Sequence, residues 1–404
     1  MAIFTLAVGL VLHAACFGGI TRPLTCTLLG VLVAVDGFVV WRSALRRDEA
    51  VFALLALVAT AFAYVRDAAR WQLFGDNIHY IRMATEGLHS ETAQPFASRW
   101  LTPLLAGGWN ITPCVGWHAL SGFNFACLAV AFFGTAVVAR RLSGTFWAGI
   151  LAIFVLSLSE FARYAAYNRL LTDPANYALH ALIAVLFLDR RRVAFAAALL
   201  LAALNSEKVL VLCPLAFALS LPAPRVRALV SWLLLGSATV APAALVLVLR
   251  WHAWHGQAPV GYDPDGAAAL AAWPPGTVYF PFMACTVPAL LSLLARPGRT
   301  SLLGLTAVAA FVQVAFASDT ERMTAYAFVC LVPFAARFFA DTGVALSTSR
   351  HSGELGLALG ALACVALLAF DSATLRVLAL VVPLAVQLAV WLATFRLRLK
   401  ASAT

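Results

Sequence analysis

The sequence predicts an all-α fold, in which a polytopic transmembrane helical bundle of about 12 to 14 spans accounts for the whole chain. The chain has 404 residues, of which 63% are hydrophobic and 11% are charged, whereas a soluble domain is about 45 to 50% apolar and about 25% charged. Apolar runs of roughly 17 to 25 residues recur from one end to the other, and each can cross a hydrocarbon core about 30 Å thick. The links between these runs are short and leave no room for a soluble domain.

We expect residues 1–404 to form a single integral membrane domain. The sequence has no internal repeat and no Gly/Ser-rich linker. The first apolar run, residues 1–19, lacks a basic leader and a small-residue cleavage site, so it is expected to stay as a span. The eight cysteines lie singly and mostly inside apolar runs, which is typical of small core residues.

The basic residues predict the orientation of the bundle. Most of them fall in short links between apolar runs or at the C-terminal end, and such links face the cytoplasm. Although the net charge is +10, these residues are scattered over many loops, so no nucleic-acid partner is expected. The links are marked by Arg42, Arg46, Arg47, Arg140, Arg141, Arg190, Arg191, Arg192, Arg225, Arg227, Arg296, Arg299, Arg396, Arg398 and Lys400. Both termini are then cytoplasmic, in what we expect to be a bacterial inner membrane, provided that residues 100–114 enter the membrane only partway.

The other face of the membrane receives polar segments of a different kind. The longest is an outer loop over residues 66–99, and the others begin at Glu160, Asn205, Trp251 and Ser318. The inside links are rich in arginine, as insertion alone requires. The outer segments instead mix acids, bases, amides and tyrosines. This asymmetry predicts an extracytoplasmic site, in a cleft that holds a polar substrate while its lipid part stays in the bilayer.

The outer loop contains a predicted short helix with polar residues on one face. Asp76, His79 and Tyr80 stand at positions i, i+3 and i+4, which share one face of a helix. Glu86 and Gly87 end that helix. An amphipathic connector at the membrane surface is the structural alternative, but it leaves the clustered Asp76 and His79 unexplained.

Other outer residues also have structural alternatives. Asp173 has the context of a helix N-cap because Pro174 follows it at the first helical position. Ser318 and Glu321 have capping-box spacing. A helix cap is the favoured interpretation at both places. It does not explain Asp319 and Arg322, which lie within and just after the capping box of Ser318 and Glu321.

Lys208 lies in a charge-bearing break, NSEK, which splits the apolar stretch 193–219. Such a break is costly unless it faces water or a partner. Lysine occurs elsewhere only at position 400, so Lys208 is a candidate point charge for binding a phosphate. An ion pair between Glu207 and Lys208 on a solvated turn is an equal alternative.

Asp36 lies near the middle of an apolar run, where a carboxylate is a candidate functional residue. A proton-coupled transporter would use such a residue, but transporters place several polar groups near the midplane. Asp36 is isolated, so a hydrogen-bonded structural role is the preferred interpretation. The histidines His13, His118 and His180 lack metal-ligand spacing. The sequence therefore specifies no metal site, and any cofactor stays unassigned.

Three features together have a parallel in a known family: an outer loop with an early Asp, a PFxxRxLxP-like ending from Pro95 to Pro103, and many spans joined by short basic inside links. In these features the chain resembles the GT-C superfamily of membrane glycosyltransferases. The resemblance implies that a sugar is taken from a polyprenyl-phosphate carrier, with an acidic residue of an outer loop beside a membrane-embedded cleft. The chain departs from the common pattern because its acidic loop follows the third span instead of the first, no second acid neighbours Asp76, and no soluble C-terminal domain follows. Donor type and dependence on a divalent metal therefore stay open.

The outer residues fit this chemistry. Sugar transfer with inversion needs a carboxylate that accepts the proton of the acceptor, and cations that stabilise the departing phosphate. Asp76 is the predicted general base, with His79 as the second catalytic residue. The predicted substrate-binding residues are Tyr80, Arg99, Arg169, Asp173, Lys208, Asp319 and Arg322.

The predicted function is thus transfer of a sugar from a polyprenyl-phosphate donor to an acceptor at the extracytoplasmic face. The expected partners are the lipid bilayer and the lipid-linked sugar donor. The alternative is a transporter or flippase of an amphipathic or lipid-linked solute, in which the outer charges form a vestibule and Asp36 carries a proton. A non-catalytic membrane scaffold is a third interpretation. An enzyme needs a one-sided outer cleft, whereas a transporter needs a polar path open to both faces.

Overall fold

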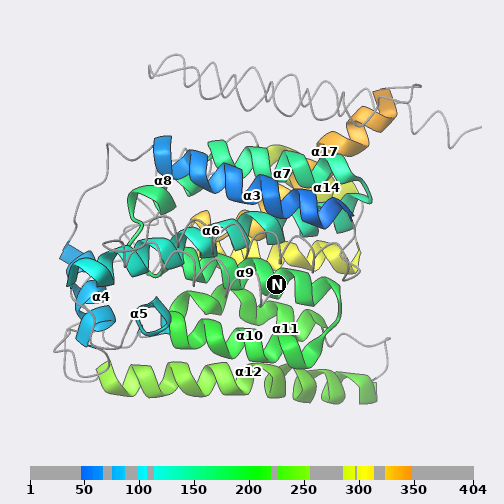
Figure 1. Cartoon of the computed structure of the whole chain (residues 1–404). Helices are drawn as coiled ribbons and strands as arrows, with labels where there is room; N and C mark the ends of the chain where they lie inside the picture. The colour runs from blue at the N-terminus through cyan, green and yellow to red at the C-terminus, as the bar shows by residue number, and fades with distance from the viewer. Residues whose placement is uncertain are drawn as a thin grey trace, which may run out of the picture. The chain divides into compact units, whose positions relative to one another are not determined.

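The computed structural model describes residues 47–66, 75–86, 99, 101–106, 113–219, 226–254, 285–295, 298–313 and 324–346. In these ranges every regular element is a helix and none is a strand (Figure 1). The all-α prediction is confirmed. The chain divides into two compact units, which we call unit 1 (Met1–Gly134 and Arg163–Tyr262) and unit 2 (Thr135–Ala162 and Asp263–Thr404). That the two units form one membrane domain stays a prediction.

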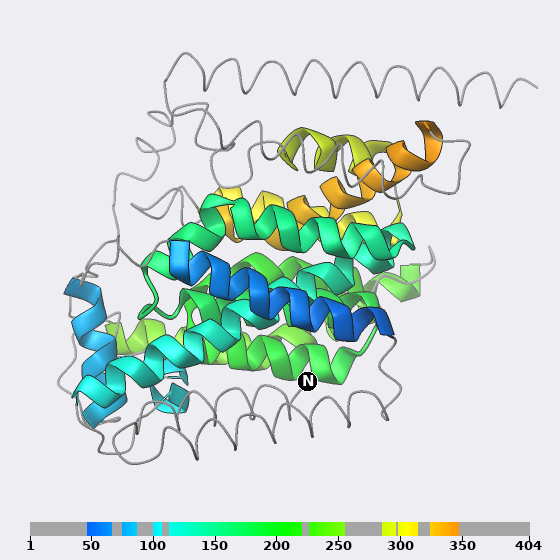
Figure 2. The same ribbon diagram turned by 45° about the horizontal axis from the view of Figure 1, so that its top comes forward.

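Unit 1 contains the helices that carry most of the outer polar segments. Helix α10 is central to it, because α10 packs against α5, α9, α11 and α12. The short α4 packs against α5, and both lie at one end of the longer helices (Figure 1, Figure 2). The elements are α3 (Arg47–Arg66), α4 (Gly75–Glu86), α5 (Leu101–Ala106), most of α6 (Pro113–Ser143), most of α8 (Glu160–Tyr167), α9 (Asp173–Leu188), α10 (Arg192–Asn205), the 3-10 helix η4 (Glu207–Leu212), α11 (Cys213–Leu219) and α12 (Val226–Trp254).

Small residues let the helices of unit 1 pack closely. A Cβ atom at Gly134 of α6 would lie 2.8 Å from the Cβ atom of Ala181 in α9. At Gly236 of α12 it would lie 2.4 Å from the ring of Phe217 in α11. Both glycines are therefore required by close approach, a common arrangement between membrane helices.

Two helices in the described ranges are long and apolar enough to cross a membrane, Ala119–Ser143 within α6 and Val230–Arg250 within α12. A third span is added if the bent pair Phe146–Leu158 and Phe161–Tyr167 is one span, with a bend of 52°. Shorter apolar helices include α9 and α10. The total of about 12 to 14 spans stays a prediction.

The apolar stretch 193–219 is broken where the sequence predicted. Helix α10 ends at Asn205, and Ser206 takes an extended conformation with φ −163° and ψ 153°. Its side chain accepts a hydrogen bond from the backbone N–H of Lys208, so it caps η4. The break places Asn205 at the end of α10 and Glu207 and Lys208 in the first turn of η4, and their polar side chains need partners.

Unit 2 is organised around α17 (Phe328–Leu346), which packs against α7, α14 and α15. The ring of Phe328 at its start lies 4.7 Å from the ring of Phe161, centroid to centroid. The other elements of this unit are the end of α6, α7 (Phe146–Leu158), α14 (Thr286–Ala295), η6 (Arg299–Leu303) and α15 (Gly304–Gln313).

Candidate functional site

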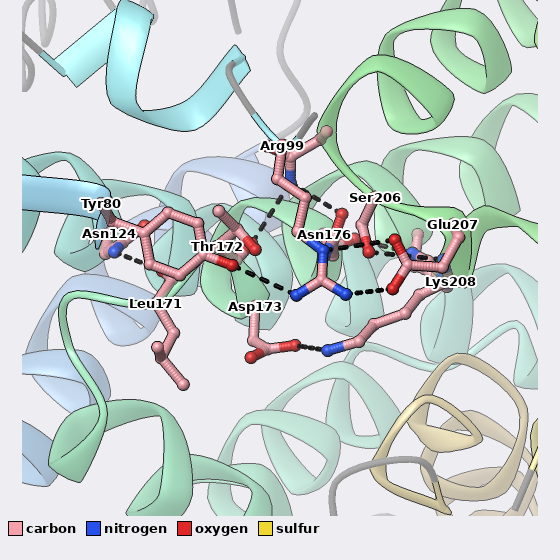
Figure 3. Close-up of polar contacts among 12 residues, drawn as sticks. Tyr80, Arg99, Asn124, Leu171, Thr172, Asp173, Asn176, Ser206, Glu207 and Lys208 are labelled. Atoms are coloured by element: carbon pink, nitrogen blue, oxygen red, sulfur yellow. Dashed lines mark hydrogen bonds and ion pairs between the residues drawn. The ribbon is translucent and has the colours of Figure 1, made fainter. Parts of the chain in front are cut away.

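Arg99, at the end of the outer loop, binds the carboxylate of Glu207 at the start of η4 (Figure 3). Its Nε atom donates to Glu207 Oε2 at 3.2 Å, and its Nη2 atom donates to Oε1. The remaining Nη1 atom donates to the hydroxyl of Tyr80 at 3.2 Å. A buried arginine thus joins α4, through Tyr80, to η4. Two parallel bonds to one carboxylate are the strongest form of this pairing.

A second guanidinium binds the same carboxylate. Arg250, near the C-terminal end of α12, donates from Nη2 to Glu207 Oε2 at 3.0 Å and from Nη1 to the backbone oxygen of Ala203 at 2.7 Å. Burial alone raises the pKa of the Glu207 carboxyl, but Arg99 and then Arg250 lower it, and the net result is a pKa well below the usual range. Glu207 is therefore an anion throughout the physiological range.

Lys208 forms a buried ion pair with Asp173, the first residue of α9 (Figure 3). The two side chains are only 4% and 3% exposed. Glu207 and Lys208 therefore do not pair with each other on a solvated turn, and that alternative is wrong. The N-cap expected at Asp173 is one residue earlier, at Thr172, whose side chain makes no capping bond. The carboxylate of Asp173 instead pairs with Lys208.

A buried amide connects the segments that carry these ion pairs. Asn205 Oδ1 accepts hydrogen bonds from the backbone N–H of Thr102 at 3.2 Å and from its hydroxyl at 2.6 Å. Asn205 Nδ2 donates to the backbone oxygen of Thr172 at 3.2 Å and to Asn176 Oδ1 at 2.7 Å. In parallel, Asn124 of α6 donates to the backbone oxygens of two residues in the turn before α9.

The structure brings four of the predicted site residues into one group, Tyr80, Arg99, Asp173 and Lys208. Arg169 lies in the turn between α8 and α9, where its guanidinium carbon is 5.6 Å from the centroid of the Tyr64 ring. His79 is half-buried on α4. The side chain of Asp76, and the residues Asp319, Arg322 and Asp36, lie outside the described part of the molecule.

Glu207, Arg250 and Asn205 complete the group but were not predicted as site residues. Glu207 was interpreted only as the neighbour of Lys208. The sequence contained a signal for Arg250, because an arginine at a span end that is predicted to face outward opposes the positive-inside rule. Among the described residues, no three His, Cys, Asp or Glu side chains gather closely enough to hold a metal ion.

A protein of known structure shares the all-α fold of this chain. No family model matches the chain, and no curated protein matches its sequence. Among solved structures, ArnT from Cupriavidus metallidurans bound to undecaprenyl phosphate is similar, with a TM-score of 0.50, 14% sequence identity and coverage of 84% of this chain and 75% of that chain. The apo state of the same ArnT has a TM-score of 0.49 and 15% identity, with coverage of 90% and 75%.

The likeness to the ArnT complex shows a shared fold. ArnT is a GT-C glycosyltransferase, so the resemblance to this superfamily is confirmed at the level of the fold. The chain is an integral membrane protein.

Proposed function

We propose that the chain is a membrane glycosyltransferase that moves a sugar, with inversion, from a polyprenyl-phosphate donor to an acceptor hydroxyl at the extracytoplasmic face. The observation that carries this proposal is the buried group formed by Arg99, Glu207, Arg250, Lys208 and Asp173. Counted over the described residues, it contains three cations and two carboxylates, a surplus of one positive charge. Buried cations held in place by carboxylates suit an anionic group whose charge grows as it leaves.

The proposed sugar-transfer reaction gives the charged residues separate roles. The acceptor oxygen forms a bond to the anomeric carbon of the sugar, and the bond from that carbon to the phosphate oxygen breaks. The electron pair leaves with the polyprenyl phosphate, where Arg99, Arg250 and Lys208 stabilise the second negative charge. The proton of the acceptor hydroxyl passes to the carboxylate of Asp76, the predicted general base. The shared fold with an ArnT that binds undecaprenyl phosphate supports a lipid phosphate as the donor's carrier.

The test measures binding of undecaprenyl phosphate to the purified chain in detergent, followed by transfer from a polyprenyl-phosphate sugar. Arg250→Gln should weaken binding by about tenfold, because one charge-assisted bond to a phosphate is removed. Arg191→Gln is the matched control, since Arg191 is exposed in the turn between α9 and α10. No binding by the native chain, or equal weakening in both variants, would refute the proposal. Solute flux without a transfer product would instead favour the transporter.

A further inference from the structure

We propose that Asn205 is a positioning residue, which holds the Arg99–Glu207 and Asp173–Lys208 ion pairs in register. The proposal depends on the proposed function in one respect, namely that the two ion pairs bind a lipid phosphate. It concerns a residue that contacts none of the four charged side chains through the hydrogen bonds of its own amide. Its effect on the site passes through the backbone on either side of its partners.

The side chain of Asn205 is used to its full capacity. It is 0% exposed, and a primary amide has two N–H donors and two lone pairs on its oxygen. The oxygen accepts two bonds from Thr102, and the nitrogen donates to Thr172 and Asn176. The orientation of the amide is unambiguous, because a backbone N–H faces one side and a backbone carbonyl faces the other. No other side chain of this length offers two donors and two acceptors.

Each member of the two ion pairs is close in sequence to this amide or to one of its partners. Arg99 is three residues before Thr102, and Asp173 directly follows Thr172. Glu207 and Lys208 are two and three residues after Asn205 itself. A single side chain therefore ties together the end of the outer loop, the start of α9 and the break after α10. These three segments supply four of the five charges in the group.

The physical consequence is a fixed distance between cations that come from different parts of the chain. Arg99 comes two residues before α5, so its position relative to Lys208 depends on where α5 begins. The bonds from Thr102 to Asn205 set that point against the C-terminal end of α10. Catalytic and binding groups lose efficiency when they are displaced by as little as about 1 Å. Loosening this amide should therefore weaken recognition of a phosphate even in protein that remains folded.

The test compares Asn205→Leu with Asn124→Leu. Both replace a fully buried amide of unit 1 with an apolar side chain of similar size, and both leave two backbone or side-chain acceptors without their donor. Thr102→Val is a milder variant, which removes one hydroxyl bond to Asn205 and keeps the backbone bond. If Asn205→Leu fails to fold, Thr102→Val takes its place in the comparison with Asn124→Leu.

The measured quantity is the coupling free energy between the side chains of Arg99 and Glu207. It comes from a double-mutant cycle of Arg99→Gln and Glu207→Gln, in which unfolding of the detergent-solubilised chain is followed for each variant. The coupling should fall by about half in the Asn205→Leu or Thr102→Val background and be retained in the Asn124→Leu background. Equal coupling in all backgrounds would overturn the proposal. In folded protein, Asn205→Leu should also weaken binding of undecaprenyl phosphate by about tenfold or more, with a smaller change for Asn124→Leu.

The two readouts separate the two proposals. If the native chain does not bind undecaprenyl phosphate, the proposed function fails, while the double-mutant cycle still decides the role of Asn205. If binding is present but the coupling is unchanged, Asn205 is a merely structural residue and the proposed function stands.

Discussion

Arg99 and Glu207 form a bidentate ion pair although 108 positions separate them in the sequence. One residue ends the outer loop, and the other opens the short helix after α10. Arg250 shares the same carboxylate from a third segment. Glu207 is therefore the common anion of two buried guanidiniums, and its removal breaks both ion pairs at once.

Glu207→Gln should lower the free energy of unfolding by about 3 to 5 kcal/mol, because removing one partner of a buried ion pair leaves an uncompensated buried charge. Glu86→Gln is the control, since Glu86 is exposed at the end of α4 and a surface substitution of this kind changes stability by about 0.5 kcal/mol or less. Chemical denaturation in detergent measures both. Equal effects would mean that the Glu207 carboxylate contributes no special stability.

The free energy of unfolding that the Glu207 carboxylate contributes should decrease on acidification. Its folded pKa is lowered, so its stabilising effect is fully present above the unfolded value, about 4.3, and is lost as pH falls from there toward the folded pKa. The difference in unfolding free energy between the native chain and Glu207→Gln should stay constant from pH 8 to about pH 5, and shrink below about pH 4. A difference that grows on acidification would contradict the assignment of the charged form.

The sequence predicted the elements of this site better than their pairing. Helix α4 and the break after Asn205 were predictable, because polar residues at helical spacing and charges within an apolar stretch are local signals. Tyr80 and Lys208 were named from the same local patterns, and Arg99 lies in the PFxxRxLxP-like ending that carried the resemblance. The partner of Lys208 was not, because Asp173 is 35 positions away and nothing in a single sequence fixes how α9 packs against η4. Asn205 was missed for the same reason, since its four bonds all reach other segments.

The effect of the Asp173–Lys208 pair on stability should be separable from its effect on binding of undecaprenyl phosphate. Lys208→Met alone removes the ammonium group that pairs with the buried carboxylate of Asp173 and should destabilise the chain by about 3 to 5 kcal/mol. The double variant Asp173→Leu and Lys208→Met replaces the pair with apolar side chains and should recover most of that stability. If Lys208 contacts the lipid phosphate, binding of undecaprenyl phosphate stays weak in the stable double variant. Restored binding there would remove Lys208 from the phosphate site.

The orientation of the bundle predicts a labelling pattern. If the arginine-rich links face the cytoplasm, a cysteine introduced as His89→Cys should react with an impermeant thiol reagent in intact cells, and one introduced as Arg191→Cys should react only after the membrane is opened. Arg191 is exposed in its turn, so lack of reaction there would not reflect burial. Of the described native cysteines, Cys127, Cys285 and Cys330 are buried and Cys213 is half-buried, so the unmodified chain gives the background. The reverse pattern would place the ion-pair group on the cytoplasmic side.

The general base is the remaining prediction, and it concerns Asp76, the second residue of α4. Tyr80, one turn further along the same helix, contacts Arg99, so the helix that carries Asp76 is tied to the ion-pair group. Asp173, a rival acid, is already engaged with Lys208. Asp76→Asn keeps the shape of the side chain and removes its ability to accept a proton.

Transfer by Asp76→Asn should therefore fall by about 100-fold to 10,000-fold, the usual contribution of general base catalysis, while the affinity for undecaprenyl phosphate is retained. Glu86→Gln, at the other end of the same helix, controls for a general effect of removing an acid from α4. Parallel assays of sugar transfer and lipid-phosphate binding on purified protein distinguish a lost proton acceptor from a lost donor site. Full transfer activity in Asp76→Asn would exclude Asp76 as the base and direct the search to Asp67 and Asp319.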